Sequence, residues 1–543
     1  MTVHERAGQP TTAADSVNIA QLVSAYYVYE PDPRKAHQKV SFGTSGHRGS
    51  ALARSFNEAH ILAIAQAICA YREEQGIEGP ILLGKDTHAL SESAYISALD
   101  VFLGNGLEVH VQTEHGYTPT PALSHAILTY NANHQKQCDG VVITPSHNPP
   151  QDGGFKYNPP HGGPADADAT RVIEKYANAL LSSGLQGVNT CEREDVLSHP
   201  KLVFVDWRKH YIDDLPRCIN MDLIKGANLR LAVDAMGGAG ADYWHQIAET
   251  YGLNIDIFND HVDPGFQFMT LDKDGKIRMD CSSPYAMAGL LAYKDRYDLA
   301  GGNDPDYDRH GIVTPDGLMN PNHYLAVAID YLCKSREWAA DVAIGKTLVS
   351  SQMIDRVVED NQRKVYEVPV GFKWFAQQLR DGDIGFAGEE SAGATLLDRQ
   401  GDVWTTDKDG IVMVLLAAEL QAATGESPSA YYKKLCAQHG EAFYQRVDTT
   451  SSLEQNARFK DIRAYKLKLT TLAESNVVDI FTKAPGNDAQ FGGVKVVLED
   501  GWFAARPSGT EPVYKIYAES FKSAAHLEQI IAEARDWVAE LIQ

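Results

Sequence analysis

Residues 58–86, EAHILAIAQAICAYREEQGIEGPILLGKD, decide the fold class of this chain. Between residues 58 and 73, apolar side chains recur at the three- and four-residue spacing of a helix with one buried face. A Gly-Pro pair at residues 79–80 then interrupts the pattern, and residues 81–86 form a short apolar run that is typical of a buried strand. A helix followed by a turn and a buried strand is the repeating unit of an α/β protein.

The same alternation continues along the chain. Strand-like runs follow helical stretches at residues 107–112, 140–143, 229–234, 254–258 and 298–301. Repeats of this order predict several α/β layers whose strands run parallel. Because ligands bind beyond the carboxyl ends of such strands, we expect the functional residues in the loops that follow them.

The length of 543 residues predicts several domains rather than one. Changes in composition occur near residues 198–204, 319–322 and 425–429. We therefore place four domains at residues 1–204, 205–320, 321–428 and 429–543. Residues 1 to about 20 are polar and lack apolar periodicity, so we expect a mobile arm or a partner-docking segment there, with order beginning near Ile19.

Composition limits the location and partners of the protein. A formal net charge of −23 argues against nucleic acid and anionic membranes, which are bound through surplus Lys and Arg. The longest apolar run, residues 411–420, is too short for a membrane span and predicts a core helix. Residues 1–17 lack the apolar segment of a signal peptide, so we expect a cytoplasmic location. The seven scattered cysteines, never spaced as Cys-x-x-Cys, argue against a disulfide framework or a zinc site.

Residues 141–150, VVITPSHNPP, place a hydroxyl at the carboxyl end of a buried strand. Ser146 is therefore expected to be an exposed nucleophile or phosphate carrier. The alternative is an Asn-Pro turn whose serine only satisfies nearby backbone groups. Lys156, within the sequence DGGFKYN at residues 152–158, brings a cation close in the sequence and favours the functional interpretation.

Residues 301–309, GGNDPDYDR, carry carboxylates at Asp304, Asp306 and Asp308. Such a group is costly to assemble without a cation between its oxygens. An EF-hand loop is excluded, because its sixth position requires Gly and here holds Arg309. Hard oxygen ligands select Mg, Ca or Mn over zinc, and three of them leave coordination positions open for a phosphate oxygen. An acidic, solvated turn is the alternative.

Three further loops are polar and rich in glycine. Residues 388–393, GEESAG, suit the hydroxyls of a sugar, although a helix N-cap turn has the same composition. Residues 506–512, RPSGTEP, offer the ingredients of a phosphate site or of a plain surface turn. Residues 43–49, GTSGHRG, add an arginine that could reach a phosphoryl group from the other side. Residues 231–240 approach a dinucleotide-binding pattern but lack the full G-x-G-x-x-G spacing, so we set that site aside.

In this order, GTSGHRG, TPSHNPP, GGNDPDYDR, VGFKWF, GEESAGA and RPSGTEP resemble the motifs of the α-D-phosphohexomutase superfamily. They run from Gly43 to Pro512 and so cover nearly the whole chain. The Glu-Glu-Ser version of the fifth motif resembles the phosphoglucomutase branch. The resemblance implies an α/β fold of four domains around a central cleft, with three related mixed α/β units and a smaller C-terminal α+β domain.

The resemblance also implies a reaction, the interconversion of α-D-glucose 1-phosphate and D-glucose 6-phosphate by intramolecular phosphoryl transfer. Ser146 would be phosphorylated in the active enzyme, and Asp304, Asp306 and Asp308 would bind Mg²⁺ together with a phosphoserine oxygen. Glucose 1,6-bisphosphate would be the intermediate and the activator. Small hexose phosphates are the expected partners, with a homodimer left open.

Further site residues follow from the matched motifs. Arg48 and Arg309 would stabilise charge on the transferring phosphoryl group. Lys156 and, second, His147 are candidates for proton handling, since a lysine among other cations can have its pKa lowered. The sugar hydroxyls and the basic lining of the cleft would involve Gly371, Lys373, Glu389, Ser391 and Lys408. The phosphate that is not being transferred would be held by Arg506, Ser508, Gly509 and Thr510.

Val370 departs from the pattern of the relatives, which often carry Thr at this position, so a side-chain hydroxyl contact is absent. A different hexose preference, such as mannose or glucosamine phosphate, is therefore an alternative. A second alternative is a metal-dependent sugar-phosphate phosphatase, in which water intercepts the phosphoseryl enzyme. A non-catalytic sugar-phosphate binding protein is disfavoured, because the serine and all three aspartates are intact.

Overall fold

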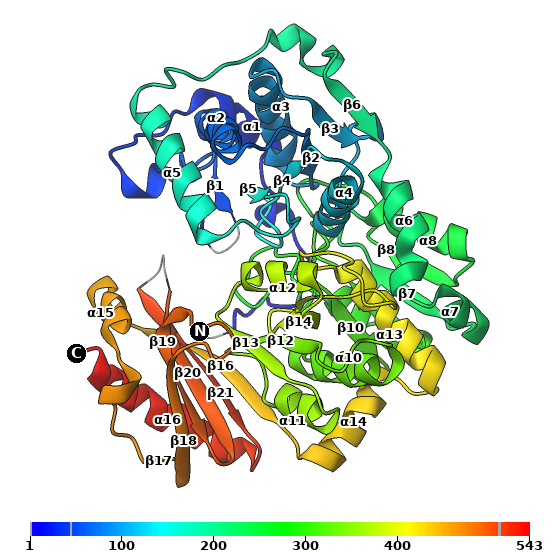
Figure 1. Cartoon of the computed structure of the whole chain (residues 1–543), viewed down its shortest axis with the longest axis vertical. Helices are drawn as coiled ribbons and strands as arrows, with labels where there is room; N and C mark the ends of the chain where they lie inside the picture. The colour runs from blue at the N-terminus through cyan, green and yellow to red at the C-terminus, as the bar shows by residue number, and fades with distance from the viewer. Residues whose placement is uncertain (1–2, 44–45, 509–511) are drawn as a thin grey trace.

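The computed structural model describes residues 3–43, 46–508 and 512–543 and contains four sheets in succession along the chain (Figure 1). The first sheet with its helices lies at the top of Figure 1, the second on the right, and the third and fourth at the bottom. The predicted α/β fold of four domains is confirmed. The exact limits of the domains stay predictions, although β6, the last strand of the first sheet, ends at Val205, one residue past the predicted boundary.

The first sheet contains the strand that was predicted at residues 81–86. Strands β4, β2, β3 and β6 run parallel, whereas β5 and β1 are antiparallel additions at one edge. In sheet order the strands are β1 (His47–Ser50), β5 (Asp152–Asn158), β4 (Asp139–Ile143), β2 (Ile81–Lys85), β3 (Val109–Gln112) and β6 (Leu202–Val205). The helices are α1 (Ile19–Val28), α2 (Glu58–Gln75), α3 (Ala89–Gly104), α4 (Thr120–Asn133) and α5 (Ala167–Ser182). The predicted helix and strand of residues 58–86 are thus confirmed as α2 and β2.

The second and third sheets repeat the plan of a parallel centre with an antiparallel edge. The second has the order β11 (Gly317–Leu318), β10 (Gly311–Thr314), β9 (Leu299–Gly302), β7 (Leu231–Asp234) and β8 (Ile255–Phe258). Its helices are α6 (Trp207–Cys218), α7 (Met221–Ala227), α8 (Ala241–Tyr251) and α9 (Ala288–Leu291). The third has the order β13 (Val365–Val368), β12 (Ala343–Thr347), β14 (Ile384–Glu389) and β15 (Gly393–Leu396). Its helices are α10 (Pro321–Ser335), α11 (Met353–Asp360), α12 (Ala376–Asp381), α13 (Gly410–Thr424) and α14 (Pro428–His439).

The fourth sheet is antiparallel and belongs to the α+β domain at the C-terminus. Its order is β16 (Phe443–Thr450), β21 (Val513–Ser520), β20 (Gly501–Pro507), β19 (Gln490–Leu498), β18 (Ser475–Lys483) and β17 (Thr471–Leu472). Helix α16 (Ala524–Leu541) packs its apolar face on this sheet, and α15 (Leu453–Arg458) follows β16. Short 3-10 turns are Ala13–Asp15, Ala36–Gln38, Thr113–His115, Arg193–Ser198, Lys294–Arg296, Phe372–Trp374, Phe459–Asp461 and Ala464–Lys466.

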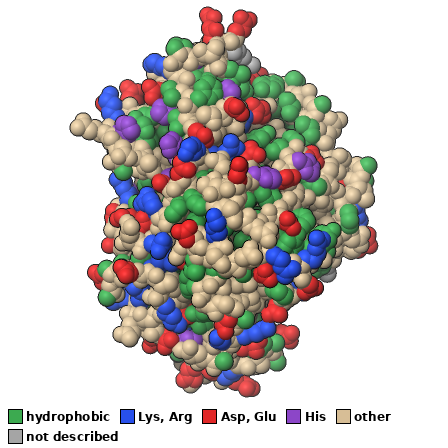
Figure 2. Space-filling model, turned by 90° about the vertical axis from the view of Figure 1, so that its right-hand side faces the viewer, with side chains coloured by type: hydrophobic (Ala, Val, Ile, Leu, Met, Phe, Trp, Pro, Cys, Tyr) green, Lys and Arg blue, Asp and Glu red, His purple; other side chains and the backbone are tan. Residues whose placement is uncertain are grey.

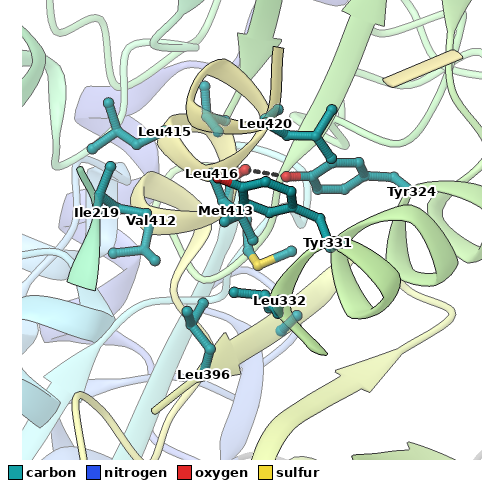
Figure 3. Close-up of a cluster of buried hydrophobic side chains, with 14 of the residues drawn as sticks. Ile219, Tyr324, Tyr331, Leu332, Leu396, Val412, Met413, Leu415, Leu416 and Leu420 are labelled. Atoms are coloured by element: carbon teal, nitrogen blue, oxygen red, sulfur yellow. Dashed lines mark hydrogen bonds between the residues drawn. The ribbon is translucent and has the colours of Figure 1, made fainter. Parts of the chain in front are cut away.

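Helix α13 lies in a core shared by the second and third domains. Its residues from Gly410 to Leu420 are all buried, which confirms the predicted core helix of residues 411–420. One hydrophobic cluster joins α13 to side chains of both domains, and Figure 3 shows part of it. Tyr324 of α10 donates a hydrogen bond of 2.6 Å to the carbonyl oxygen of Met413 within this cluster. Because a helix that is apolar all round must be covered on every side, α13 joins the two domains.

The N-terminal segment is placed against the second domain. Pro10 pairs with Thr270 in an antiparallel bridge. Gly8 N donates to the carbonyl oxygen of Leu271 at 2.7 Å, and Leu271 N donates back to that of Gln9 at 2.9 Å. The expectation that order begins near Ile19 was therefore wrong. Backbone hydrogen bonds hold this segment, and these require no apolar pattern in the sequence.

The surface mixes charges of both signs, and Figure 2 shows acidic and basic side chains interspersed over one face of the molecule. Among the helices of the described residues, none combines the length and the apolar character needed to span a bilayer.

Candidate active site

Ser146 lies in the loop after β4, where the sequence predicts a phosphate carrier. Its φ of +60° is a left-handed conformation that is unfavourable for residues other than glycine. The Ser146 N–H donates to Thr144 Oγ1 at 2.8 Å, which helps to hold this conformation. The serine is 1 % exposed, so the expectation of an exposed nucleophile was wrong. A loop from the second domain covers it.

That covering loop follows β9 and carries the three aspartates. Ser146 Oγ donates a hydrogen bond of 2.7 Å to Asp304 Oδ2. Asp304, Asp306 and Asp308 are all buried, and one carboxylate oxygen of each lies within 4.8 Å of the others. We call these three residues the acidic cluster. The fold thus brings together a hydroxyl and a carboxylate that are 158 residues apart in the sequence.

The acidic cluster has unused ligand atoms. Asp306 Oδ1 and Asp308 Oδ1 are buried and accept no hydrogen bond from any described residue. Burial, and then the charges of Asp306 and Asp308, raise the pKa of Asp304 well above its ordinary value. Buried carboxylate oxygens with free lone pairs repel one another unless a cation lies between them. The cluster therefore fits a divalent ion that prefers oxygen ligands.

Two lysines balance part of the cluster's charge. Lys156 Nζ, from β5, donates to Asp306 Oδ2 at 2.5 Å and to Asp308 Oδ2 at 3.3 Å. Lys408 Nζ lies 3.1 Å from the same oxygen of Asp308. Burial alone would raise the pKa of Asp308, but Lys408 and Lys156 hold it far below its ordinary value. Burial likewise lowers the pKa of Lys156, yet the two aspartates outweigh it and the pKa is raised. The expected lowering of the Lys156 pKa was therefore wrong for this arrangement.

Two arginines and a histidine surround the serine loop. Arg48 Nη1, from β1, donates to Asn148 Oδ1 at 3.3 Å. Arg309 carries its Nε 3.9 Å from the last aspartate of the cluster. His147 Nδ1 lies 3.4 Å from Ser146 Oγ. Burial, and then the charge of Arg309, lower the pKa of His147 well below its ordinary value, so the neutral ring can accept a proton.

Glu389 is the last residue of β14, and Ser391 lies in the turn that leads to β15. Glu389 Oε1 accepts a hydrogen bond of 2.9 Å from Gly371 N, and Gly371 has a φ of +123° that favours glycine. His310 N, at the end of the loop that carries the acidic cluster, donates to the carbonyl oxygen of Ala392 at 3.0 Å. The predicted sugar-binding turn and the predicted metal loop are therefore in direct contact.

The predicted phosphate loop meets the third domain. Arg506, near the end of β20, and Val370 line one cavity of about 80 Å³ between the third and fourth domains. Lys373 is half-buried, and burial lowers its pKa. Ser508 is the residue after β20. Two residues of the predicted set lie outside the described part of the chain, namely Gly509 and Thr510.

Sequence reasoning missed Thr120, at the start of α4. Its Oγ1 donates to Asp306 Oδ2 at 3.0 Å, and its N–H donates to the Asp306 carbonyl oxygen at 2.9 Å. The first domain thus holds one aspartate of the second. The run Thr-Pro-Thr-Pro at residues 118–121, which follows a parallel strand, was the available signal, since such loops carry function.

The glycines after β7 have a packing role. A Cβ atom on Gly238 would lie 2.7 Å from Pro305 Cα, and one on Gly240 would lie 2.4 Å from a ring carbon of Tyr307. Both neighbours belong to the loop of the acidic cluster. The stretch set aside as an incomplete dinucleotide motif therefore allows this loop to approach closely.

Comparison with known families matches all four domains. The phosphoglucomutase/phosphomannomutase models for α/β/α domains I, II and III match residues 39–183, 209–317 and 320–439, respectively. The model for the C-terminal domain of the same family matches residues 456–536. A phosphoglucomutase of Komagataeibacter xylinus is 55% identical over 538 residues, which cover 98% of this chain and 97% of that protein. Phosphoglucomutase 2 of Saccharomyces cerevisiae is 26% identical over 89% of this chain and 90% of its own.

Solved structures share the fold. The open form of the phosphoprotein parafusin, a phosphoglucomutase from Paramecium, has a TM-score of 0.74 at 20% identity, over 95% of this chain and 96% of that one. A phosphoglucomutase/phosphomannomutase family protein from Burkholderia thailandensis has a TM-score of 0.67 at 18% identity, over 92% and 98%. At these identities the likeness concerns the fold alone.

Proposed function

The chain belongs to the phosphoglucomutase/phosphomannomutase family, and from this premise we propose that it is a phosphoglucomutase. It interconverts α-D-glucose 1-phosphate and D-glucose 6-phosphate through a phosphorylated Ser146 and a glucose 1,6-bisphosphate intermediate. The observation that carries this proposal is the 2.7 Å hydrogen bond from Ser146 Oγ to Asp304 Oδ2 in the acidic cluster. A phosphoryl group on this oxygen would lie beside the proposed metal ligands.

Mg²⁺ is the proposed metal. Asp304, Asp306 and Asp308 would hold it together with a phosphate oxygen on Ser146, and the buried oxygens without hydrogen bonds support this fit. When bound, the ion supplies positive charge that neutralises the transferring phosphoryl group. Glucose 1,6-bisphosphate is the proposed activator, because it would phosphorylate Ser146 in enzyme that has lost its phosphoryl group.

The proposed reaction consists of two phosphoryl transfers. A substrate hydroxyl attacks the phosphorus on Ser146, so that an O–P bond to the sugar forms and the Oγ–P bond breaks. The proton of that hydroxyl passes to His147, whose neutral ring lies beside Ser146 Oγ. Lys156, the other candidate, keeps its own proton beside the two aspartates and would stabilise negative charge instead. Arg48 and Arg309 stabilise the spread negative charge. The bisphosphate then turns over in the cleft, and its other phosphoryl group returns to Ser146.

The remaining proposed residues bind the parts of the substrate that do not react. Sugar hydroxyls and the basic lining of the site involve Gly371, Lys373, Glu389, Ser391 and Lys408. The second phosphate is held by Arg506, Ser508, Gly509 and Thr510. Binding energy from this remote phosphate can serve to position the reacting end, so loss of Arg506 should lower turnover as well as affinity.

Phosphomannomutase activity is the second candidate, because Val370 lines the cavity beside Arg506 and has no hydroxyl for the sugar. Phosphatase activity is the third candidate, in which water would attack the phosphoserine in place of a sugar hydroxyl. A cytoplasmic location, a homodimer and the domain limits predicted from the sequence form part of the same proposal.

A coupled assay of glucose 6-phosphate formation, with Mg²⁺ and a trace of glucose 1,6-bisphosphate, tests the function. Ser146→Ala should lower turnover by more than about 10³-fold, and intact mass measurement should find a phosphoryl group on the wild type alone. Wild-type turnover that survives in Ser146→Ala would contradict the phosphoserine route. Parallel assays with mannose 1-phosphate, and of phosphate release, separate the two alternatives.

A further inference from the structure

The turn between β2 and α3, residues 86–88, is buried beneath the Ser146 loop and has no role in the reaction described above. Asp86, the first residue of this turn, accepts two hydrogen bonds on each carboxylate oxygen. Asp86 Oδ1 accepts from His88 N at 3.0 Å and from Ser91 Oγ at 2.6 Å. Asp86 Oδ2 accepts from His88 Nδ1 and from Thr144 Oγ1, both at 2.7 Å. Asp86 thus fixes His88 and one end of the Ser146 loop at once.

His88 has acceptors at both ring nitrogens. Nδ1 donates to Asp86, and Nε2 donates to the carbonyl oxygen of Asn148 at 3.0 Å. A carboxylate and a carbonyl can only accept, so the ring carries two protons and a positive charge. Burial alone would lower the pKa of His88, but the charge of Asp86 more than offsets this and the pKa is raised. The buried side chain therefore forms an ion pair with Asp86.

The Ser146 loop is held at two points on either side of the serine. Before it, Thr144 Oγ1 donates to Asp86 and accepts from Ser146 N. After it, Asn148 O accepts from His88. A left-handed φ at a residue other than glycine persists only where its surroundings impose it. These two points can impose the conformation that directs the Ser146 side chain to Asp304.

The same turn contacts the second domain. Thr87 Oγ1 donates to the carbonyl oxygen of Gly237 at 2.7 Å. The His88 ring packs on Phe266 with ring centroids 4.9 Å apart. Two residues beyond Gly237, Ala239 N donates to the carbonyl oxygen of Pro305, within the loop of the acidic cluster, at 2.8 Å. Residues 86–88 therefore contact the Ser146 loop directly, and they are linked to the loop of the acidic cluster through residues 237–239.

We infer that His88 is a positioning residue that holds the backbone of Asn148 and so keeps Ser146 Oγ in line with the acidic cluster. This inference rests on the proposed function, because it concerns the same nucleophile. His88 does not touch the reacting atoms. Its loss should misplace the nucleophile and leave substrate binding intact, since the proposed sugar and phosphate residues come from other loops.

Two substitutions at His88 separate the two hydrogen bonds. In His88→Gln the side-chain amide nitrogen can take the place of Nε2 and keep the bond to Asn148. In His88→Asn the amide can take the place of Nδ1 and keep only the bond to Asp86. We expect His88→Asn to lower kcat by about 10- to 100-fold, with KM for glucose 1-phosphate within about threefold of wild type. His88→Gln should recover most of that loss.

Ser91→Ala is the matched control, because it removes a hydrogen bond to Asp86 that does not reach the Ser146 loop. Its kcat should stay within about twofold of wild type. A second measurement, the rate at which glucose 1,6-bisphosphate phosphorylates Ser146, should fall in His88→Asn and recover in His88→Gln. If His88→Asn does not fold, Asp86→Asn serves instead and should lower kcat without a rise in KM.

Equal kcat values in His88→Asn and His88→Gln, or a loss that falls on KM alone, would overturn the inference. An unchanged kcat in Asp86→Asn would do the same. Failure of the proposed function would look different, because the wild type would then show no mutase activity in the same assay.

Discussion

Thr120→Val should weaken the proposed binding of Mg²⁺ without touching a metal ligand. The substitution keeps the branched shape of the side chain but removes the hydroxyl that donates to Asp306 Oδ2 at 3.0 Å. A hydrogen bond to a charged group contributes about 1.5–3 kcal/mol, and about 1.4 kcal/mol is a tenfold change in an equilibrium constant. Because Lys156 donates to the same oxygen, part of the loss is offset. We expect the lower end, about a tenfold weaker apparent affinity for Mg²⁺.

The assay is the initial rate of glucose 6-phosphate formation as a function of Mg²⁺ concentration. The chain offers a matched control two residues away, since Thr118 is equally buried but its Oγ1 has no hydrogen-bond partner among the described residues. Thr118→Val therefore removes no such bond and should leave the Mg²⁺ dependence at the wild-type value. The prediction is refuted if the two variants reach their half-maximal rates at the same Mg²⁺ concentration. It is also refuted if Thr120→Val reaches its half-maximal rate at no higher Mg²⁺ concentration than the wild type.

Two further predictions concern stability. Burial raises the pKa of Asp234 to about 6, so the folded state binds its proton more tightly than the unfolded state, and stability is lost as the pH rises from about 4 to about 6. Asp234→Asn removes this loss. The difference in free energy of unfolding between Asp234→Asn and wild type, measured in denaturant titrations, should therefore change by roughly 2–3 kcal/mol in favour of the variant between pH 4 and pH 8. A difference that does not depend on pH would contradict this prediction. Deleting residues 1–11 removes the acceptor of the Leu271 N–H, so exchange of that amide should quicken by about tenfold or more in hydrogen-exchange measurements, while the Val233 amide in β7 stays unchanged as the control.

The residues that could be predicted from the sequence are those whose chemistry lies within one short loop. The acidic cluster is an example, because three carboxylates in five residues after a strand indicate a metal site before any fold is known. The position of Ser146 after a strand could be predicted equally well, but its burial could not, since the covering residue Asp304 is 158 positions away in the sequence. His88 went unnoticed for the same reason, because it acts through a long-range hydrogen bond and does not differ locally from an ordinary helix start. Thr120 also acts through a long-range hydrogen bond, although the Thr-Pro-Thr-Pro run at residues 118–121 marked its loop.

The strands and the core helix α13 could be predicted because burial leaves an apolar pattern in the sequence. The N-terminal segment could not, since backbone groups bind it to the second domain and leave no such pattern. The packing role of the glycines near Gly238 was missed for a related reason, because the space that a missing side chain leaves is visible only when the neighbouring loop is in place.

Helix α13 also limits how this enzyme can change. Its first residue, Gly410, donates a backbone hydrogen bond of 2.9 Å to Tyr307, between two of the proposed metal ligands. The residue before its N-cap is Lys408, which pairs with Asp308, and its body fills the core shared by two domains. A change in this helix that reshapes the proposed sugar site should therefore also shift the proposed metal ligands. Selection for a new hexose should spare α13 and accumulate substitutions in loops such as the one around Val370, where side chains can vary while the reaction centre is left undisturbed.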